Sequence, residues 1–185
     1  MRKSEIAVFA GGCFWCTEAI FKRLRGVIAV VSGYAGGETE NPSYEEVSTG
    51  ETGHTEAVKI EFDPQIISFN KLLKIFWAIF DPTTKNRQGN DVGAQYRSVV
   101  FYTNDDQKEK ANKSIKEMDH LKIYKNLIVT EVLPLGKFYT AEEYHQNYYE
   151  NNKTLNPYCK FVIDPKIKKL IEHFNNDVKK EYING

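Results

Sequence analysis

The stretch "SEIAVFAGGCFWCTEAIFKRLRGVIAVVSGY", residues 4–34, contains the first three elements of the fold. Residues 4–10 predict a strand that ends at a pair of glycines. Residues 14–25 place apolar side chains on one face at helical spacing, and residues 26–34 are rich in β-branched side chains, which favour a buried strand. The chain therefore begins with a β-α-β unit.

The rest of the chain continues this mixture of strands and helices. In residues 55–64, the apolar Val58, Ile60 and Phe62 point to one side, as in a strand with one buried face. Residues 69–80 are apolar around most of a helical circumference, which favours a buried helix. Further strands are expected at residues 97–103 and within 126–135, and further helices after Asn104, after Thr140 and from Asp164-Pro165.

This order predicts a single domain over residues 1–185 with an α+β fold, a two-layer α/β sandwich around a mixed sheet with a ferredoxin-like core. Two long loops, residues 35–54 and 81–96, interrupt the regular elements. Loops longer than about 12–15 residues are usually functional or disordered. Because these two are rich in Tyr, Asn, Gly, Asp and Arg, we expect them to be ordered and functional.

Charge and hydropathy exclude several classes of protein. Lys+Arg and Asp+Glu both number 25 and no basic stripe stands out, so no nucleic-acid partner is expected. No apolar run approaches the ~18 residues that cross a membrane, and no signal peptide is seen, so we expect a cytoplasmic protein without a membrane span. No coiled-coil pattern appears, and a monomer is expected. Three cysteines suit a reducing compartment, where cysteines are more often catalytic or metal-binding than structural.

The segment "GGCFWCTE", residues 11–18, allows three kinds of chemistry. Cys13 and Cys16 could be half of a metal site, the redox pair of a disulfide exchanger, or a nucleophile and its neighbour in an aromatic pocket. A zinc site needs about four ligands, but Cys159 stands alone and the four histidines show no paired spacing, so no metal is expected. The plainest alternative is that these cysteines are small buried hydrophobic residues.

Cys13 lies at the start of the first predicted helix, directly after the two glycines. Unpaired N–H groups and the helix dipole favour a thiolate there, so the sequence predicts a lowered pKa and a reactive sulfur. Cys16 lies one helical turn further on and could form a disulfide with Cys13. Phe14 and Trp15 could belong to the core, or could form the wall of a pocket for an apolar group of a substrate.

A carboxyl group would supply the acid that such a site needs, and there are three candidates. Glu18 lies in the first turn of the predicted helix, where an acidic residue commonly does no more than offset the helix dipole. Glu56 begins a strand after the glycine-rich loop, and Asp91 lies in the second long loop. The residues alone do not show whether Glu56 or Asp91 is the better candidate for the acid.

Four blocks of the sequence, in this order, resemble the signature blocks of the A-type peptide methionine sulfoxide reductases across roughly residues 8–165. They are "GGCFWCTE", "GYAGG…NPSYEEVSTGETGHTEAVKIEFDP", "FDPTTKNRQGNDVGAQYRS" and "AEEYHQNYYENN". A likeness of four ordered blocks is far more specific than a single C-x-x-C. The resemblance implies reduction of the S epimer of methionine sulfoxide, free or in proteins, to methionine, and it implies no cofactor.

The resemblance also implies a role for each matching residue. Cys13 would attack the sulfoxide sulfur, and Glu56 would give a proton to the sulfoxide oxygen, which requires that burial raises the pKa of that carboxyl. Tyr44 and Tyr96 would donate hydrogen bonds to the same oxygen. The other substrate contacts would come from Phe14 and Trp15 at the methyl group, Asp91 at the backbone amide, and His145 at the mouth of the site.

The product on the protein would be a Cys13 sulfenic acid, which a second thiol converts to a disulfide and which thioredoxin then reduces. Many family members carry a glycine in place of Cys16 and resolve the sulfenic acid with a cysteine in a glycine-rich tail. This chain has both Cys16 and Cys159, and a helix follows Cys159, so either could be the resolving cysteine. Two rival functions are a thiol–disulfide oxidoreductase that uses Cys13 and Cys16 alone, and a domain that binds methionine-containing segments without turnover.

Overall fold

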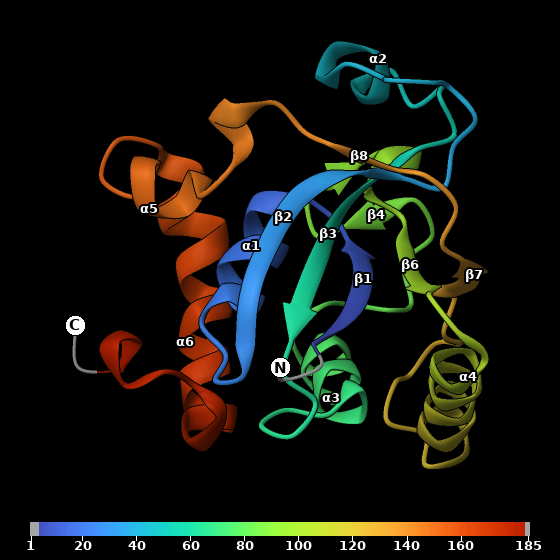
Figure 1. Ribbon diagram of the computed structural model, residues 1–185, viewed down its shortest axis with the longest axis vertical. Coiled ribbons are helices and arrows are strands. Elements are labelled where there is room, and N and C mark those ends of the chain that lie inside the picture. Colours follow the sequence, from blue (N-terminus) through green and yellow to red (C-terminus); the bar gives the residue numbers. More distant parts are fainter. Residues whose placement is uncertain (1–3, 184–185) are drawn as a thin grey trace.

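A six-stranded mixed sheet lies at the centre of the computed structural model, which describes residues 4–183 (Figure 1). The strand order is β7-β6-β1-β3-β2-β8, and neighbouring strands are antiparallel except β6 and β7, which are parallel. The strands are β1 (Glu5–Gly11), β2 (Val27–Ala35), β3 (Thr55–Phe62), β6 (Ser98–Tyr102), β7 (Glu131–Pro134) and β8 (Phe138–Thr140).

Helices connect the central strands in two crossovers. β1 and β2 lie on either side of β3 and are joined by α1, and β3 and β6 lie on either side of β1 and are joined across α3. The helices are α1 (Phe14–Lys22), α2 (Tyr44–Ser48), α3 (Phe69–Ile79), α4 (Asp105–His120), α5 (Tyr148–Asn152) and α6 (Asp164–Phe174). None of them, within residues 4–183, is long and apolar enough to cross a membrane. A mixed sheet with packed helices agrees with the predicted α+β class.

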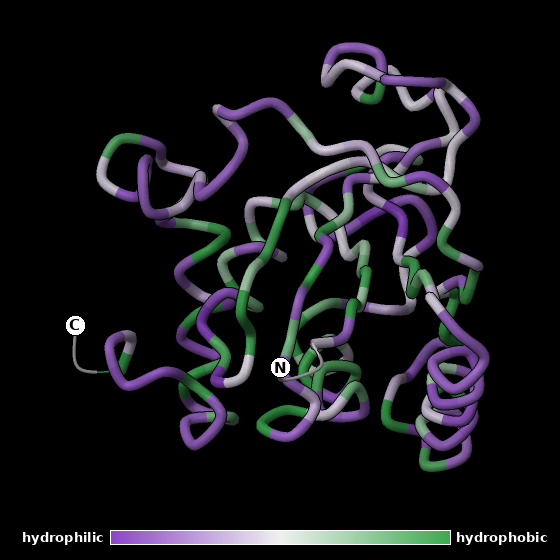
Figure 2. The backbone as a smooth tube through the Cα atoms, in the orientation of Figure 1, coloured by the Kyte–Doolittle hydropathy of each residue, from purple (hydrophilic) through white to green (hydrophobic). Residues whose placement is uncertain are grey.

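The two faces of the sheet have separate apolar cores. Val58, Ile60 and Phe62 of β3 are fully buried in the main core together with residues of α1, α3 and α6, which confirms the alternation predicted for this strand. Ala57, on the opposite face, belongs to a smaller cluster against which Phe138 packs. Figure 2 shows hydrophobic residues along the central strands, whereas α4, at the lower right, is mostly hydrophilic.

Both long loops contain regular structure. The first carries α2, which begins at a capping box. The second carries a small hairpin of β4 (Arg87–Gln88) and β5 (Asp91–Val92), followed by a 3₁₀ turn at Ala94–Tyr96. The two loops therefore hold defined positions at one end of the sheet, as expected for ordered loops.

The helix expected directly after Thr140 is wrong. Thr140 ends strand β8, which pairs with β2, and the chain then makes only a 3₁₀ turn at Glu143–His145 before α5 begins. The side chain of Gln146 accepts a hydrogen bond from the Ser32 backbone N–H of β2 (3.0 Å), which extends the same contact. Pairing with a distant strand outweighs the local capping pattern here.

The last helix also begins earlier than expected. A π-helical turn at Cys159–Ile163 leads straight into α6, so Asp164 does not cap a helix. Asp164 instead accepts a hydrogen bond from the Tyr149 hydroxyl (2.6 Å). The strand expected within residues 126–135 is confined to the four residues of β7.

Candidate active site

Cys13 lies where β1 turns into α1. It is the N-cap residue of α1, and its carbonyl oxygen accepts hydrogen bonds from the backbone N–H groups of Cys16 (3.1 Å) and Thr17 (3.4 Å). Gly12 has a φ of +89°, and a Cβ at this position would lie 2.5 Å from the Gln88 Cβ, so glycine lets the second long loop pack closely here. Only 7% of Cys13 is exposed, and its sulfur is therefore at a covered helix start.

Glu56 of β3 reaches the same helix start. One oxygen of its carboxyl group accepts a hydrogen bond from the backbone N–H of Phe14 (2.9 Å), the residue after Cys13. Only 2% of Glu56 is exposed, and this burial raises the pKa of its carboxyl to about 8, although the Phe14 N–H acts in the opposite direction. The carboxyl group therefore keeps its proton at neutral pH, as the acid role predicted for it requires.

Tyr44 and Tyr96 come to this centre from the two long loops, Tyr44 from α2 and Tyr96 from the 3₁₀ turn after β5. Burial raises the pKa of both hydroxyls, and the nearby Glu56 and Cys13 raise them further. Both phenols therefore stay protonated and can donate hydrogen bonds. The structure brings these four residues together, although they are far apart in the sequence.

An aromatic cluster stands beside Cys13. The Trp15 ring lies flat against the Tyr148 ring, with centroids 3.6 Å apart and planes 5° apart. The Trp15 indole N–H donates to Nδ1 of His145 (3.0 Å), and the ring of Phe14 lies 5.0 Å from that of His145. Tyr44 lies 4.4 Å from His145 between ring centroids. Five rings therefore form one continuous aromatic wall, namely those of Phe14, Trp15, Tyr44, His145 and Tyr148. This wall contains both side chains predicted to contact a substrate methyl group, Phe14 and Trp15.

His145 is neutral in this wall, because burial lowers its pKa. Its Nδ1 accepts the Trp15 N–H, so in the neutral ring the proton is assigned to Nε2. His145 is 1% exposed, and Nε2 has no hydrogen-bond partner within residues 4–183. His145 therefore offers an unused N–H donor inside the wall.

The three cysteines are all free thiols and all buried. The lowered pKa predicted for Cys13 is wrong for this structure, because burial raises the pKa of Cys13 well above its usual range, and a hydrogen bond with Cys16 adds to this. The same hydrogen bond lowers the pKa of Cys16 to about 7, and the charge of Lys166 also lowers it. The two thiols thus share a hydrogen bond, and Cys16 is the more acidic one.

Tyr158 connects Asp91 to the cysteine pair and directly precedes Cys159 in the chain. The Tyr158 hydroxyl donates to a carboxylate oxygen of Asp91 (2.7 Å) and lies 3.7 Å from the sulfur of Cys16. Cys159, the next residue, is fully buried in the π-helical turn, and burial raises its pKa. The structure therefore brings Asp91 to the cysteine pair, with its carboxylate already bonded to a tyrosine.

Sequence reasoning missed three side chains that shape the site: Tyr158, Glu142 and Tyr34. Glu142 accepts hydrogen bonds from the Tyr34 hydroxyl (2.7 Å) and from the Tyr44 backbone N–H (2.8 Å), so it ties α2 to β2. Glu142 lies in the same sequence block as His145, and Tyr158 directly precedes Cys159. These positions were the only signals available, since each contact joins residues that are far apart in the chain.

Other regions offer less chemistry. Within residues 4–183, no group of three or more His, Cys, Asp or Glu side chains is arranged to hold a metal ion. A groove of about 690 Å³ between α3 and α4 is lined by residues such as Trp77, Met118 and Tyr124, and no cysteine or histidine lines it. The cluster around Cys13 and Glu56 is therefore the candidate active site.

Comparisons with known proteins agree on one family. The family model "Peptide methionine sulfoxide reductase" matches residues 5–179 of the chain. The peptide methionine sulfoxide reductase MsrA of Sulfolobus acidocaldarius is 54% identical over 170 residues, which cover 92% of this chain and 95% of the relative. Mxr1 from Saccharomyces cerevisiae in reduced form superposes with a TM-score of 0.76 at 34% identity, over 83% of this chain and 88% of that chain. Mxr1 from Saccharomyces cerevisiae in complex with Trx2 superposes with a TM-score of 0.55 at 26% identity, over 79% of this chain and 85% of that chain.

Proposed function

Since this chain belongs to the peptide methionine sulfoxide reductase family, we propose that it reduces the S epimer of methionine sulfoxide, free or in proteins, to methionine. The family makes it an oxidoreductase that acts on methionine sulfoxide, and repair of oxidised proteins follows from that activity. The observation that carries the proposal is the buried, protonated Glu56 at the helix start that bears Cys13.

In the proposed reaction the Cys13 sulfur bonds to the sulfoxide sulfur while Glu56 gives a proton to the sulfoxide oxygen. The oxygen then passes to Cys13 and the thioether leaves, so the substrate is reduced by two electrons and the thiol is oxidised to a sulfenic acid. The Cys13 proton passes to the carboxylate that Glu56 becomes as it protonates the sulfoxide oxygen, so the step balances and no thiolate has to form before the attack. This explains how a cysteine whose own pKa is raised can still attack.

The surrounding side chains suit a neutral sulfoxide. The hydroxyls of Tyr44 and Tyr96 would donate to the oxygen, on which negative charge builds up. Phe14 and Trp15 would hold the methyl group, since methyl and sulfur groups contact aromatic rings favourably. In this proposal Asp91 accepts from the substrate backbone amide, which displaces the Tyr158 hydroxyl, and His145 supports Trp15 and Phe14 from within the buried wall rather than at the mouth of the site.

We further propose that Cys16 resolves the sulfenic acid. Its thiol attacks the sulfur of Cys13, water leaves, and a disulfide forms between residues one helical turn apart. The hydrogen bond between the two thiols and the lower pKa of Cys16 support this choice over Cys159, whose pKa burial raises. A thioredoxin would then reduce the disulfide, in keeping with the complex of Mxr1 with Trx2.

The epimer assignment is tested with separated R and S methionine sulfoxide and dithiothreitol as reductant. We expect methionine to form from the S epimer alone, and equal consumption of both epimers would contradict the proposal. If no methionine forms from either, a binding domain without turnover would be favoured.

The resolving cysteine is tested by counting free thiols after one turnover without reductant. Cys159→Ser should lose two thiols, like the natural chain, whereas Cys16→Ser should lose one and keep a sulfenic acid that a carbon acid such as dimedone traps. The reverse pattern would make Cys159 the resolving cysteine.

We also propose that residues 1–185 act as one domain with a ferredoxin-like core. Its support is the antiparallel order β6-β1-β3-β2 with the crossovers of α1 and α3. The monomeric state and the cytoplasmic location stay predictions, which light scattering and fractionation would test.

A further inference from the structure

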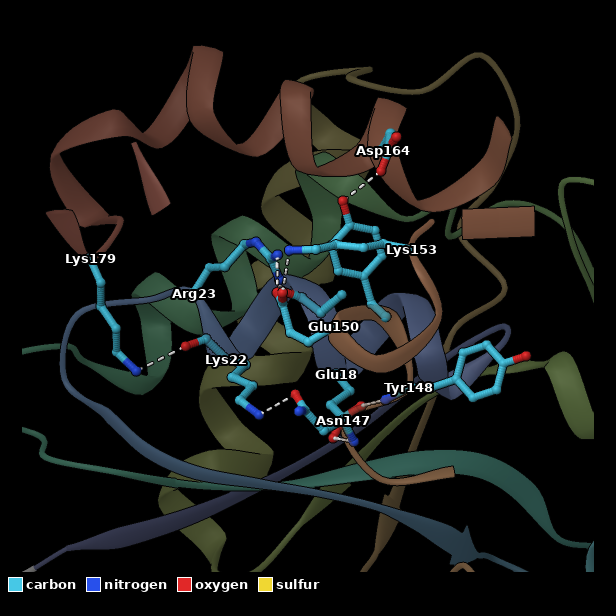
Figure 3. Close-up of polar contacts among 11 residues, drawn as sticks. Glu18, Lys22, Arg23, Asn147, Tyr148, Glu150, Lys153, Asp164 and Lys179 are labelled. Carbon is cyan, nitrogen blue, oxygen red and sulfur yellow. Dashed lines mark hydrogen bonds and ion pairs between the residues drawn. The ribbon is translucent and has the colours of Figure 1, made fainter. Parts of the chain in front are cut away.

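One face of α1 carries a row of contacts to the segment of residues 145–148, and Figure 3 shows those of Glu18 and Lys22. Trp15, Glu18 and Lys22 share this face, because they are three and four residues apart in a helix. The contacts run in order along the helix, from Trp15 to His145 and Tyr148, from Glu18 to the backbone of Asn147 and Tyr148, and from Lys22 to the side chain of Asn147.

Glu18 is the buried member of this row, with 2% of the residue exposed. One oxygen of its carboxyl group accepts the backbone N–H of Asn147 (2.7 Å), and the other accepts the backbone N–H of Tyr148 (3.3 Å). This use differs from the dipole-offsetting role expected from the sequence, because Glu18 lies in the second turn of α1 and its oxygens face another segment. Burial raises the pKa of Glu18, so the carboxyl group is held there against a desolvation cost.

The backbone that Glu18 holds has an unusual conformation. Asn147 has φ 54° and ψ 32°, in the left-handed region, and no side chain of its own segment caps the short helix α5 that follows. Asparagine adopts this region more readily than other residues with a side chain, and here the Glu18 carboxyl group holds the backbone N–H groups of Asn147 and Tyr148. The two hydrogen bonds to Glu18 therefore set where α5 begins and how Tyr148 leaves the backbone.

The position of Tyr148 matters for the site because its ring lies flat against Trp15. Trp15 in turn donates to His145, whose ring belongs to the same wall. A single buried carboxyl group is thus linked, through the stacked ring of Tyr148, to Trp15, which is proposed to hold the substrate methyl group, and through Trp15 to His145.

We propose that Glu18 is a positioning residue of the reaction: by holding the backbone N–H groups of Asn147 and Tyr148 it keeps the Tyr148 ring against Trp15, and so fixes the wall that receives the substrate methyl group. The inference rests on the proposed function in one respect, namely that Trp15 contacts the substrate. Glu18 touches neither the substrate nor Cys13 and acts only through Tyr148 and Trp15.

The test compares Glu18→Ala and Glu18→Gln with the matched control Lys22→Met, which removes a contact from the same helix face to the same residue, Asn147, but not to its backbone. We expect Glu18→Ala to raise KM for methionine sulfoxide about three- to tenfold with a smaller change in kcat, the size expected for a lost aromatic stack. Glu18→Gln keeps one acceptor oxygen and should give an intermediate KM. Lys22→Met should leave KM within about twofold, because the backbone N–H groups of Asn147 and Tyr148 keep their hydrogen bonds to Glu18.

Two further readouts separate positioning from general stability. Trp15 and Trp77 are the two tryptophans, so in a Trp77→Phe background the emission reports Trp15 alone. We expect Glu18→Ala to shift this emission to longer wavelength, because Trp15 loses its stacked neighbour. In a Tyr148→Ala background, Glu18→Ala should change KM by less than about twofold, since both substitutions remove the same contact.

The inference would be overturned if Glu18→Ala lowered Tm and left both KM and the emission unchanged, because Glu18 would then be structural only. It would also be overturned if the KM effects of Glu18→Ala and Tyr148→Ala multiplied. Trp15→Ala distinguishes a failure of the proposed substrate contact of Trp15 from a failure of the positioning role of Glu18. An unchanged KM in Trp15→Ala would reject the proposed substrate contact and this inference with it, whereas a raised KM there and an unchanged one in Glu18→Ala would reject this inference alone.

Discussion

Glu56 and Glu150 are carboxyl groups at opposite ends of α1, and burial on its own raises the pKa of both. Glu56, at the start of the helix, meets the Phe14 N–H, and within residues 4–183 no cationic side chain pairs with it, so its pKa rises to about 8. Glu150, at the other end, pairs with Arg23 and Lys153, and these charges outweigh burial and lower its pKa below the ordinary value. The same chemical group is a neutral acid in one place and an ion in the other.

The difference shows that proton-transferring groups and stabilising ion pairs lie at opposite ends of α1. Arg23 is 5% exposed, yet it is paired with Glu150, and its guanidinium carbon lies 4.8 Å from the centroid of the Tyr149 ring and 4.6 Å from that of Tyr182. Charged groups that are buried with partners hold the C-terminal segments against α1. Ionisable groups that are buried without opposite charges, at Cys13 and Glu56, keep their protons and can transfer them.

The largest effect is expected at the start of the helix. Glu56→Gln keeps the size of the side chain and removes the acid, so the rate of a single turnover should fall about 10²- to 10⁴-fold. Glu150→Gln is the matched carboxyl substitution at the other end of α1. It should leave that rate within about threefold, since it removes ion pairs with Arg23 and Lys153 but no reacting group. Equal losses of single-turnover rate in the two variants, measured by rapid quench, would contradict the assignment of the acid role to Glu56.

At the other end, Arg23→Met should be costly for stability alone. It leaves Glu150 with one exposed partner and removes two cation–π contacts, so the free energy of unfolding should fall by about 3 kcal/mol. Urea denaturation measures this loss, and the single-turnover rate below the unfolding transition should not change. A rate that fell together with stability would show that the two ends are not separate.

Loss of the acid should also stabilise the fold at high pH. Because the pKa of Glu56 is about 8 in the folded chain and 4.5 as its ordinary value, the unfolded chain binds fewer protons between these pH values, and stability falls as pH rises through that window. Glu56→Gln lacks this cost, so it should be more stable than the natural chain by an amount of the order of 5 kcal/mol above pH 8. Near pH 4 the gain should vanish, and thermal unfolding at both pH values decides the matter.

The smallest effect is expected for Lys153, the exposed partner of Glu150. Its side chain is 48% exposed, so Lys153→Met should change the free energy of unfolding by less than about 0.5 kcal/mol. A loss as large as that of Arg23→Met would mean that the exposed cation, rather than the buried one, keeps Glu150 ionised.

Much of the fold follows from local patterns. The alternation at Val58, Ile60 and Phe62 gave the buried face of β3, and the apolar circumference of residues 69–80 gave the buried α3. The wrong helix after Thr140 has a physical cause, because its segment pairs with β2, more than a hundred residues earlier, and local propensity carries no information on that pairing.

The site divides in the same way. Cys13, Glu56, Tyr44 and Tyr96 lie in sequence blocks that resemble a family, and the structure places them around one helix start. Tyr158 and Glu18 could not be assigned, because their contacts join residues 67 and 129 positions apart. The raised pKa of Cys13 was also out of reach, because the helix N-terminus is visible in the sequence whereas the burial that outweighs it is not.

The protonation state of Glu56 can be measured directly by ¹³C NMR on protein labelled at the glutamate carboxyl carbons, with the Glu56 signal assigned from its absence in Glu56→Gln. Following that signal from pH 4 to pH 10 gives the pKa without any turnover. We predict a midpoint near 8. A midpoint near 4.5, with the carboxylate ionised at neutral pH, would contradict the acid role on which the proposed reaction is built.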